Sequence, residues 1–140
     1  MKLIKNKFKY PDLQRVENEL GRFYLDSNGQ EVPSVTNVLS STSDQSGIDE
    51  WKRRVGYEEA ERILQESSSI GSNVHNALES YLQDKDCEIK DDGSYISKTS
   101  ILILESFINN LVNDINEVWG LESGLILDGL YAGTADCIGI

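Results

Sequence analysis

The fold is decided by residues 121–138, which read LESGLILDGLYAGTADCI. Two apolar, strand-like runs, 121–127 and 130–138, flank Asp128-Gly129, a dipeptide that favours a tight turn between strands. The sequence therefore predicts a hairpin in this region. Each predicted strand carries one carboxylate, Glu122 on the first strand and Asp136 on the second.

The length of the connecting loop decides whether Glu122 and Asp136 face the same way, because one residue of slip in a strand reverses every side chain. A two-residue loop pairs Leu127 with Leu130 and leaves the two carboxylates on opposite faces. A three-residue loop, with Gly129 in the left-handed conformation and a bulge, puts both on one face. We expect this longer loop, or a bulge, if the two carboxylates share a metal.

Asp136 is the more informative of the two acidic residues. Its neighbours Ala135, Cys137 and Ile138 are typical of a buried strand, and a buried carboxylate needs a partner or a metal. The simpler interpretation makes Glu122 a surface charge of an edge strand and Asp136 a turn residue at the end of a strand.

The remaining elements follow from local patterns. Runs at 22–25 and 30–32 flank Asp26-Ser27-Asn28-Gly29, which predicts a second hairpin. Ser34 is a suitable cap for a short helix after it. Further helices are expected over residues 48–55, 57–82 and 96–119. The second is one helix, or two with a break near 67–71, and Gly120 ends the third. Helices precede an unfinished sheet, so we predict an α+β fold in one domain, residues 1–140.

Composition narrows the class of protein. The net charge is −11, from 24 acidic and 13 basic residues, which argues against broad, charge-driven binding of nucleic acid. Local basic patches remain at Lys2, Lys5, Lys7 and Lys9, for which solvated surface is the simpler interpretation, and at residues 52–54. The two cysteines lie far apart in the sequence, at 87 and 137, which excludes a zinc or disulfide framework. No apolar run is long enough to span a membrane, so we expect a cytoplasmic protein and no membrane partner.

His75 is the only histidine in the chain. On a helix it shares a face with Gly71 and Glu79, each four residues away, and it lies beside an apolar stripe that contains Val74 and Leu78. A partly buried histidine with a hydrogen-bond partner explains this position. The functional alternative is a metal ligand or a proton carrier.

Four motifs occur in order from residue 22 onward. They are Val32-Pro33-Ser34-Val35-Thr36 followed by 39–42, Glu50-Trp51-Lys52-Arg53-Arg54-Val55-Gly56, Gly71 followed by His75-Asn76-Ala77-Leu78-Glu79-Ser80-Tyr81-Leu82, and Tyr131-Ala132-Gly133-Thr134-Ala135-Asp136-Cys137-Ile138-Gly139. In this order they resemble the PD-(D/E)XK nuclease superfamily, in its RecB-like branch. Within it the chain is similar to phage exonucleases and to the mitochondrial genome maintenance exonuclease.

The resemblance implies an activity and a set of site residues. It makes His75 and Asp136 ligands of Mg²⁺ or Mn²⁺, with Glu122 assisting, for metal-assisted hydrolysis of phosphodiester bonds. It implies an α/β-like nuclease core and an exonuclease acting on DNA in a phage or its bacterial host. The residues that it places against single-stranded DNA are Ser34, Thr36, Lys52, Arg53 and Arg54.

The family has an acidic-x-Lys motif on the strand after the one that carries the metal-binding aspartate, here Asp136. The sequence stops before such a strand, at Ile140. We therefore expect catalysis to need a complementing C-terminal segment, a second polypeptide or another copy of the chain. Two alternatives stay open. One is a non-catalytic binding module on a nuclease-derived scaffold, and the other is a domain whose acidic surface binds a basic protein.

Overall fold

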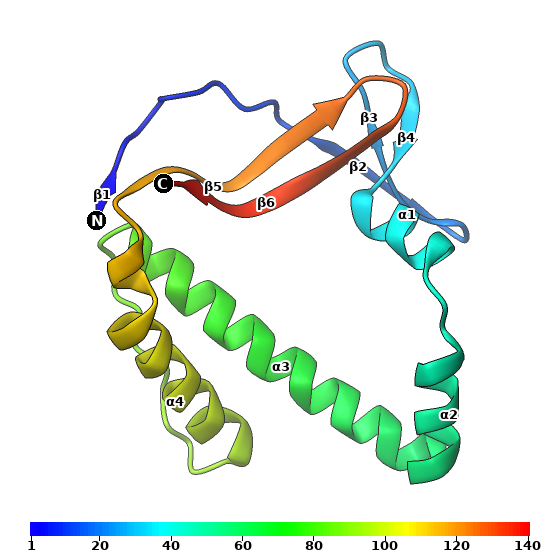
Figure 1. Ribbon diagram of the computed structural model, residues 1–140, viewed down its shortest axis with the longest axis vertical. Helices are drawn as coiled ribbons and strands as arrows, with labels where there is room; N and C mark the ends of the chain where they lie inside the picture. The colour runs from blue at the N-terminus through cyan, green and yellow to red at the C-terminus, as the bar shows by residue number, and fades with distance from the viewer. The chain divides into compact units, whose positions relative to one another are not determined.

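The computed structural model describes residues 1–140 and has the predicted α+β fold. It contains four α-helices and two three-stranded sheets (Figure 1). The chain forms two compact units, and the single domain stays a prediction. Unit 1 comprises residues 1–3 and 45–117, and unit 2 comprises residues 4–44 and 118–140. No helix is both long enough and apolar enough to cross a membrane.

Unit 1 consists mainly of helices. The helix α2 (Ser46–Val55) is joined to α3 (Tyr57–Leu82) through Gly56, whose φ of 93° favours glycine. The helix α4 (Tyr95–Asn110) packs along α3. It begins at Ser94, whose side-chain oxygen accepts a hydrogen bond from the N–H of Ser97. The predicted helices over 48–55 and 57–82 are confirmed.

The long helix α3 is continuous over 26 residues, which settles the choice between one helix and two. Its middle carries three serines and Gly71, all poor helix formers. Ala60, Val74, Ala77 and Leu82 are nevertheless buried along its length. Packing of this face provides the stability that the local sequence lacks, as it does for most helices in proteins.

The predicted end of α4 is wrong. The helix stops at Asn110 rather than at Trp119, and a short 3₁₀ turn, η1 (Val112–Asp114), follows it. Asparagine and aspartate, which are frequent between 109 and 116, compete with helical hydrogen bonds. Val118 is fully buried in the next strand. The apolar residues after 115 thus belong to a strand, although they continue the spacing of the helix.

Unit 2 contains a small antiparallel sheet in the order β2 (Gln14–Asn18), β3 (Gly21–Leu25) and β4 (Glu31–Pro33). The hairpin of β3 and β4 is the predicted one. Ser34 follows it and caps α1 (Val35–Thr42), accepting a hydrogen bond of 3.0 Å from the N–H of Asn37. The strand β2 is not predicted, because only Val16 in it is apolar.

The C-terminal hairpin consists of β5 (Glu117–Leu127) and β6 (Tyr131–Gly139), close to the predicted bounds (Figure 1). Leu127 pairs with Tyr131, so the loop has three residues, 128–130. Gly129 has a φ of 74°, and the N–H of Leu130 donates to the carbonyl of Leu127 at 3.0 Å. The loop is therefore the longer of the two that the sequence allows.

The N-terminal segment runs alongside strand β5. The short strand β1 (Lys2–Leu3) pairs with β5, with a hydrogen bond of 2.9 Å from Lys2 N–H to the carbonyl of Asn116. Further along, the N–H of Ile4 donates to the carbonyl of Val118 at 2.8 Å. Gly124 lacks a side chain where Pro11 and Leu13 lie against the strand. Small residues in β5 thus let a second stretch of backbone approach closely.

The buried carboxylate of Asp26 connects the two hairpin turns of unit 2. It accepts hydrogen bonds of 2.9 Å from the N–H groups of Asn28 and Gln30 in its own turn, and of Gly129 in the other. Burial opposes its ionisation, but these three donors prevail and lower the pKa of Asp26. Beside this contact lies the core of unit 2, which is formed by Tyr24, Val32 and Ala132 with Leu13 and Ile126 packed against it.

Candidate functional site

Glu122 and Asp136 occupy facing positions of the C-terminal hairpin. Leu121 pairs with Cys137 and Ser123 with Ala135, so the register sets Glu122 across from Asp136. The backbone of Glu122 is unusual, with a φ of 46°. The loop has the length that we expected if the two carboxylates share a metal. Because the φ of Glu122 departs from that of a regular strand, we infer that the two side chains share a face from the single pocket that both of them line.

These two carboxylates line a cavity of about 750 Å³ that lies wholly within unit 2. The same cavity is lined by basic and polar residues as well as apolar ones: Arg15 from β2, Arg22 from β3, and Ser34 and Thr36 at the start of α1. Four residues that the sequence nominated, Glu122, Asp136, Ser34 and Thr36, are thus brought to one pocket. Residues 34 and 36 belong to the predicted contact with single-stranded DNA, and the two acids to the predicted metal site.

Both arginines of the pocket contact the same carboxylate, that of Glu17. Arg15 and Arg22 both form ion pairs with Glu17, and the Nε of Arg22 lies 3.5 Å from the Oε1 of Glu17. The hydrogen bond from Arg15 lowers the pKa of Glu17, and Arg22 adds to this effect. These ion pairs are exposed to solvent and therefore weak, and each guanidinium group has donors left for a further anion.

The exposure of Asp136 corrects one expectation. Asp136 and Cys137 are exposed, and Ala135 and Ile138 are half-buried, so the cost of burial does not demand a metal here. Strand β6 is the last strand in the order β1-β5-β6 and so lies at an edge of its sheet, as expected for the final strand of the sequence. Partial burial and the nearby Asp136 raise the pKa of the Cys137 thiol.

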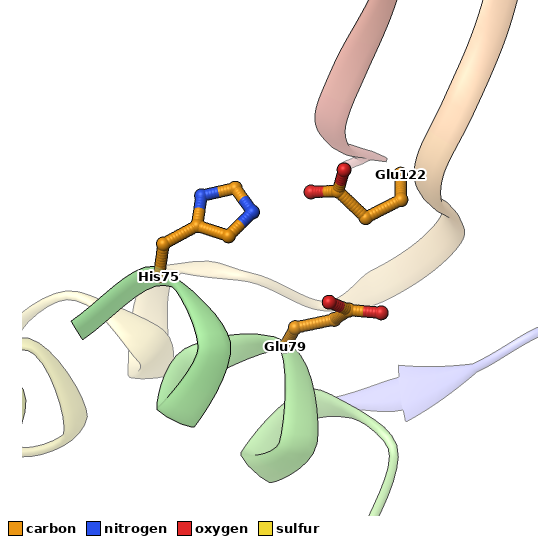
Figure 2. A group of neighbouring side chains, drawn as sticks. All are labelled: His75, Glu79 and Glu122. Carbon is orange, nitrogen blue, oxygen red and sulfur yellow. The ribbon is translucent and has the colours of Figure 1, made fainter. Parts of the chain in front are cut away.

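His75 belongs to unit 1, where it is half-buried on α3. Glu79 projects from the same side of the helix one turn later, as Figure 2 shows together with Glu122 of strand β5. A ring nitrogen of His75 and a carboxylate oxygen of Glu79 lie within 4.8 Å of each other. The shared helix face predicted from the sequence is confirmed, and the pair has the residue types of a cation site.

The basic residues 52–54 form the last turn of α2 in unit 1. Lys52 is half-buried, while Arg53 and Arg54 are exposed. The Nε of Arg53 donates to the carbonyl of Asp49 at 3.4 Å. Cations in this position complement the negative end of the helix dipole, so the cluster has a structural role whether or not it contacts DNA.

Sequence reasoning missed Arg15 and Arg22. Both lie on strands, and Arg15 is on the strand that was not predicted. The one available signal was the spacing of Arg15, Glu17 and Arg22, with opposite charges on either side of a turn at residues 19–20. That spacing is common on polar surfaces and gives no sign of a pocket.

Comparison with protein families, with curated proteins and with solved structures finds no match for this chain. The resemblance to the PD-(D/E)XK nucleases consequently stays a prediction.

Proposed function

We propose that this protein is a nuclease-type domain that acts on phosphodiester bonds of single-stranded DNA with Mg²⁺ or Mn²⁺. One observation carries the proposal. Glu122 and Asp136 face each other across the hairpin and line the same pocket as Arg15 and Arg22. Such a reaction uses carboxylates to bind a cation and cationic groups to bind a phosphate, and unit 2 holds both. The acidic-x-Lys motif would come from a complementing segment.

The residues fit a hard divalent cation. Mg²⁺ and Mn²⁺ favour carboxylate oxygens, and Mg²⁺ keeps several waters, which suits carboxylates that are exposed to solvent. Like charges directly across an antiparallel ladder are destabilising, and a cation between Glu122 and Asp136 would offset that repulsion. When bound, the cation would lower the pKa of a coordinated water and polarise the phosphate.

The basic residues and the helix start that line the pocket suit the phosphate of a nucleotide chain. Arg15 and Arg22 can each donate to phosphate oxygens in a forked geometry. The first turn of α1, at Val35 and Thr36, lines the same pocket, and the start of a helix carries a partial positive charge that favours an anion. These groups would orient the phosphate toward the two carboxylates.

His75 has a metal-binding role by the family resemblance, and its pairing with Glu79 supports a part in binding a cation. We propose His75 as a further metal ligand, to be tested by a variant of its own. An activity that survives His75→Ala but not Asp136→Asn would restrict the metal chemistry to unit 2.

A non-catalytic binding module is the second candidate function. The two arginines of the pocket, which both pair with Glu17, favour it, because they can bind a phosphate whether or not it is cleaved. On this alternative, single-stranded DNA binds to the pocket and remains intact, and the acidic residues restrict binding to one face.

The deciding experiment is a cleavage assay with end-labelled single-stranded DNA and Mn²⁺. The full chain is compared with Asp136→Asn and with Glu31→Gln, which removes one charge from an exposed residue of unit 2 outside the pocket. Cleavage by the chain and by Glu31→Gln, but not by Asp136→Asn, supports the nuclease. The assay is repeated with an added segment that carries the acidic-x-Lys motif. Binding without cleavage under both conditions supports the binding module. Cleavage unchanged in Asp136→Asn contradicts the proposal.

A further inference from the structure

A cluster of lysines and aromatic rings lies on unit 2 at the end of β5 that is farther from its loop. We call it the lysine–aromatic strip and define it as Lys5, Lys7, Phe8, Lys9 and Trp119. The three lysines are exposed, and Phe8 exposes 52% of its surface. The Nζ of Lys7 lies 3.9 Å from the centre of the Trp119 ring, a cation–π contact.

The strip is held in place by the strand beneath it. The rings of Phe8 and Trp119 meet edge to face with centroids 5.9 Å apart, and Phe8 meets Tyr10 in the same way at 6.4 Å. The hydroxyl of Tyr10 donates to the carbonyl of Trp119 at 3.3 Å. Gly120 leaves the space that the Tyr10 ring fills, since a Cβ there would lie 2.9 Å from it. The half-exposed ring of Phe8 is thus supported from two sides.

Residues 1–11, which contain most of the strip, carry a charge opposite in sign to that of the whole chain. The chain carries −11 in total, yet residues 1–11 contain four lysines and no acidic residue. Asp12 is the first acid that follows. A local excess of positive charge beside an exposed ring is the combination that binds single-stranded nucleic acid, with lysines at phosphates and bases stacked on rings.

We propose that the lysine–aromatic strip is a contact surface for single-stranded DNA, separate from the pocket of Glu122 and Asp136. The inference rests on the proposed function for the identity of the strand, because a strand engaged at the pocket extends beyond it along unit 2. It requires no metal. Lys5, Lys7 and Lys9 pair with backbone phosphates, and a base stacks on the exposed face of Phe8.

The test is a fluorescence anisotropy titration of labelled oligothymidylate in EDTA, at several salt concentrations. The full chain is compared with Lys5→Gln/Lys7→Gln/Lys9→Gln. The matched control is Lys85→Gln/Lys90→Gln/Lys98→Gln, which removes the same charge from exposed residues of unit 1. Each phosphate contact adds about 0.7 to the slope of log K against log salt for single strands, so the first variant should lose about 2 from that slope. The control should keep the slope of the full chain.

A second variant, Phe8→Ala, separates stacking from charge. It should weaken binding roughly 5- to 150-fold, the range for loss of one stacked base, and leave the salt slope unchanged. Circular dichroism confirms that each variant is folded. Equal affinities and slopes for the two lysine variants would overturn the inference, and so would a full chain that does not bind the oligonucleotide in EDTA. Neither result bears on Mn²⁺ binding at the pocket, which is measured without DNA.

Discussion

Gly124 is the position where a single added carbon should disturb unit 2 most clearly. In the strand β5 it faces the N-terminal segment, and a Cβ there would lie 2.5 Å from the carbonyl oxygen of Pro11 and 2.8 Å from the Cγ of Leu13. A carbonyl oxygen belongs to the backbone and cannot rotate away as a flexible side chain can. The segment must therefore move away from the strand when Gly124 is replaced by alanine.

The expected change in the free energy of unfolding of Gly124→Ala follows from two opposing effects. Overpacking of a well-packed region costs about 1–3 kcal/mol. Alanine in place of glycine in a strand interior returns roughly 0.5–1 kcal/mol through a smaller loss of backbone entropy. The free energy of unfolding of Gly124→Ala should thus fall by up to about 2.5 kcal/mol and should not rise.

The assay is equilibrium unfolding in urea, followed by tryptophan fluorescence in a Trp51→Phe background, so that Trp119 reports on unit 2 alone. Gly71→Ala on α3 of unit 1 is the control, because a Cβ there meets nothing within 4 Å. It should stabilise the helix by up to about 1 kcal/mol, measured by far-ultraviolet circular dichroism, and leave the Trp119 transition unchanged. A Gly124→Ala protein more stable than the parent, as expected for an uncrowded glycine in a strand, would refute the close packing of the N-terminal segment on β5.

Two further predictions concern unit 2. Ser34→Ala removes the cap of α1, a hydrogen bond of 3.0 Å to the N–H of Asn37, and should lower the free energy of unfolding by about 1 kcal/mol in the same urea assay. The lowered pKa of Asp26 means that its carboxylate stabilises unit 2 above about pH 4, the unfolded value. That contribution is lost as the pH falls through the lower folded value. Asp26→Asn should be less stable than the parent at pH 7 and lose less stability on acidification, and parallel pH profiles would exclude this role.

The sequence predicted most of the elements that position the site. The Asp128-Gly129 dipeptide and the alternating runs beside it located the C-terminal hairpin, and the two possible loop lengths were known in advance. The choice between them was not, because the pairing of Leu127 with Tyr131 rather than Leu130 depends on the whole ladder. Ser34, likewise, was found as a cap from its residue type alone.

The parts that sequence missed depend on contacts between distant segments. Strand β2 has a single apolar residue, Val16, and exists because β3 pairs with it. Arg15 reaches the pocket only through that pairing. The helix predicted to run to Trp119 stops at Asn110, since Val118 is buried in a strand and Gly120 accommodates Tyr10. Spacing alone could not distinguish these residues from the last turns of a helix.

Calorimetric titration with Mn²⁺, without DNA, tests the central claim most directly. The parent chain, Glu122→Gln, Asp136→Asn and the control Glu31→Gln are compared at neutral pH. If Glu122 and Asp136 hold one cation, the parent and Glu31→Gln give a saturable heat, and each pocket variant loses it or binds at least about tenfold more weakly. Indistinguishable isotherms for the parent and Asp136→Asn would contradict the claim.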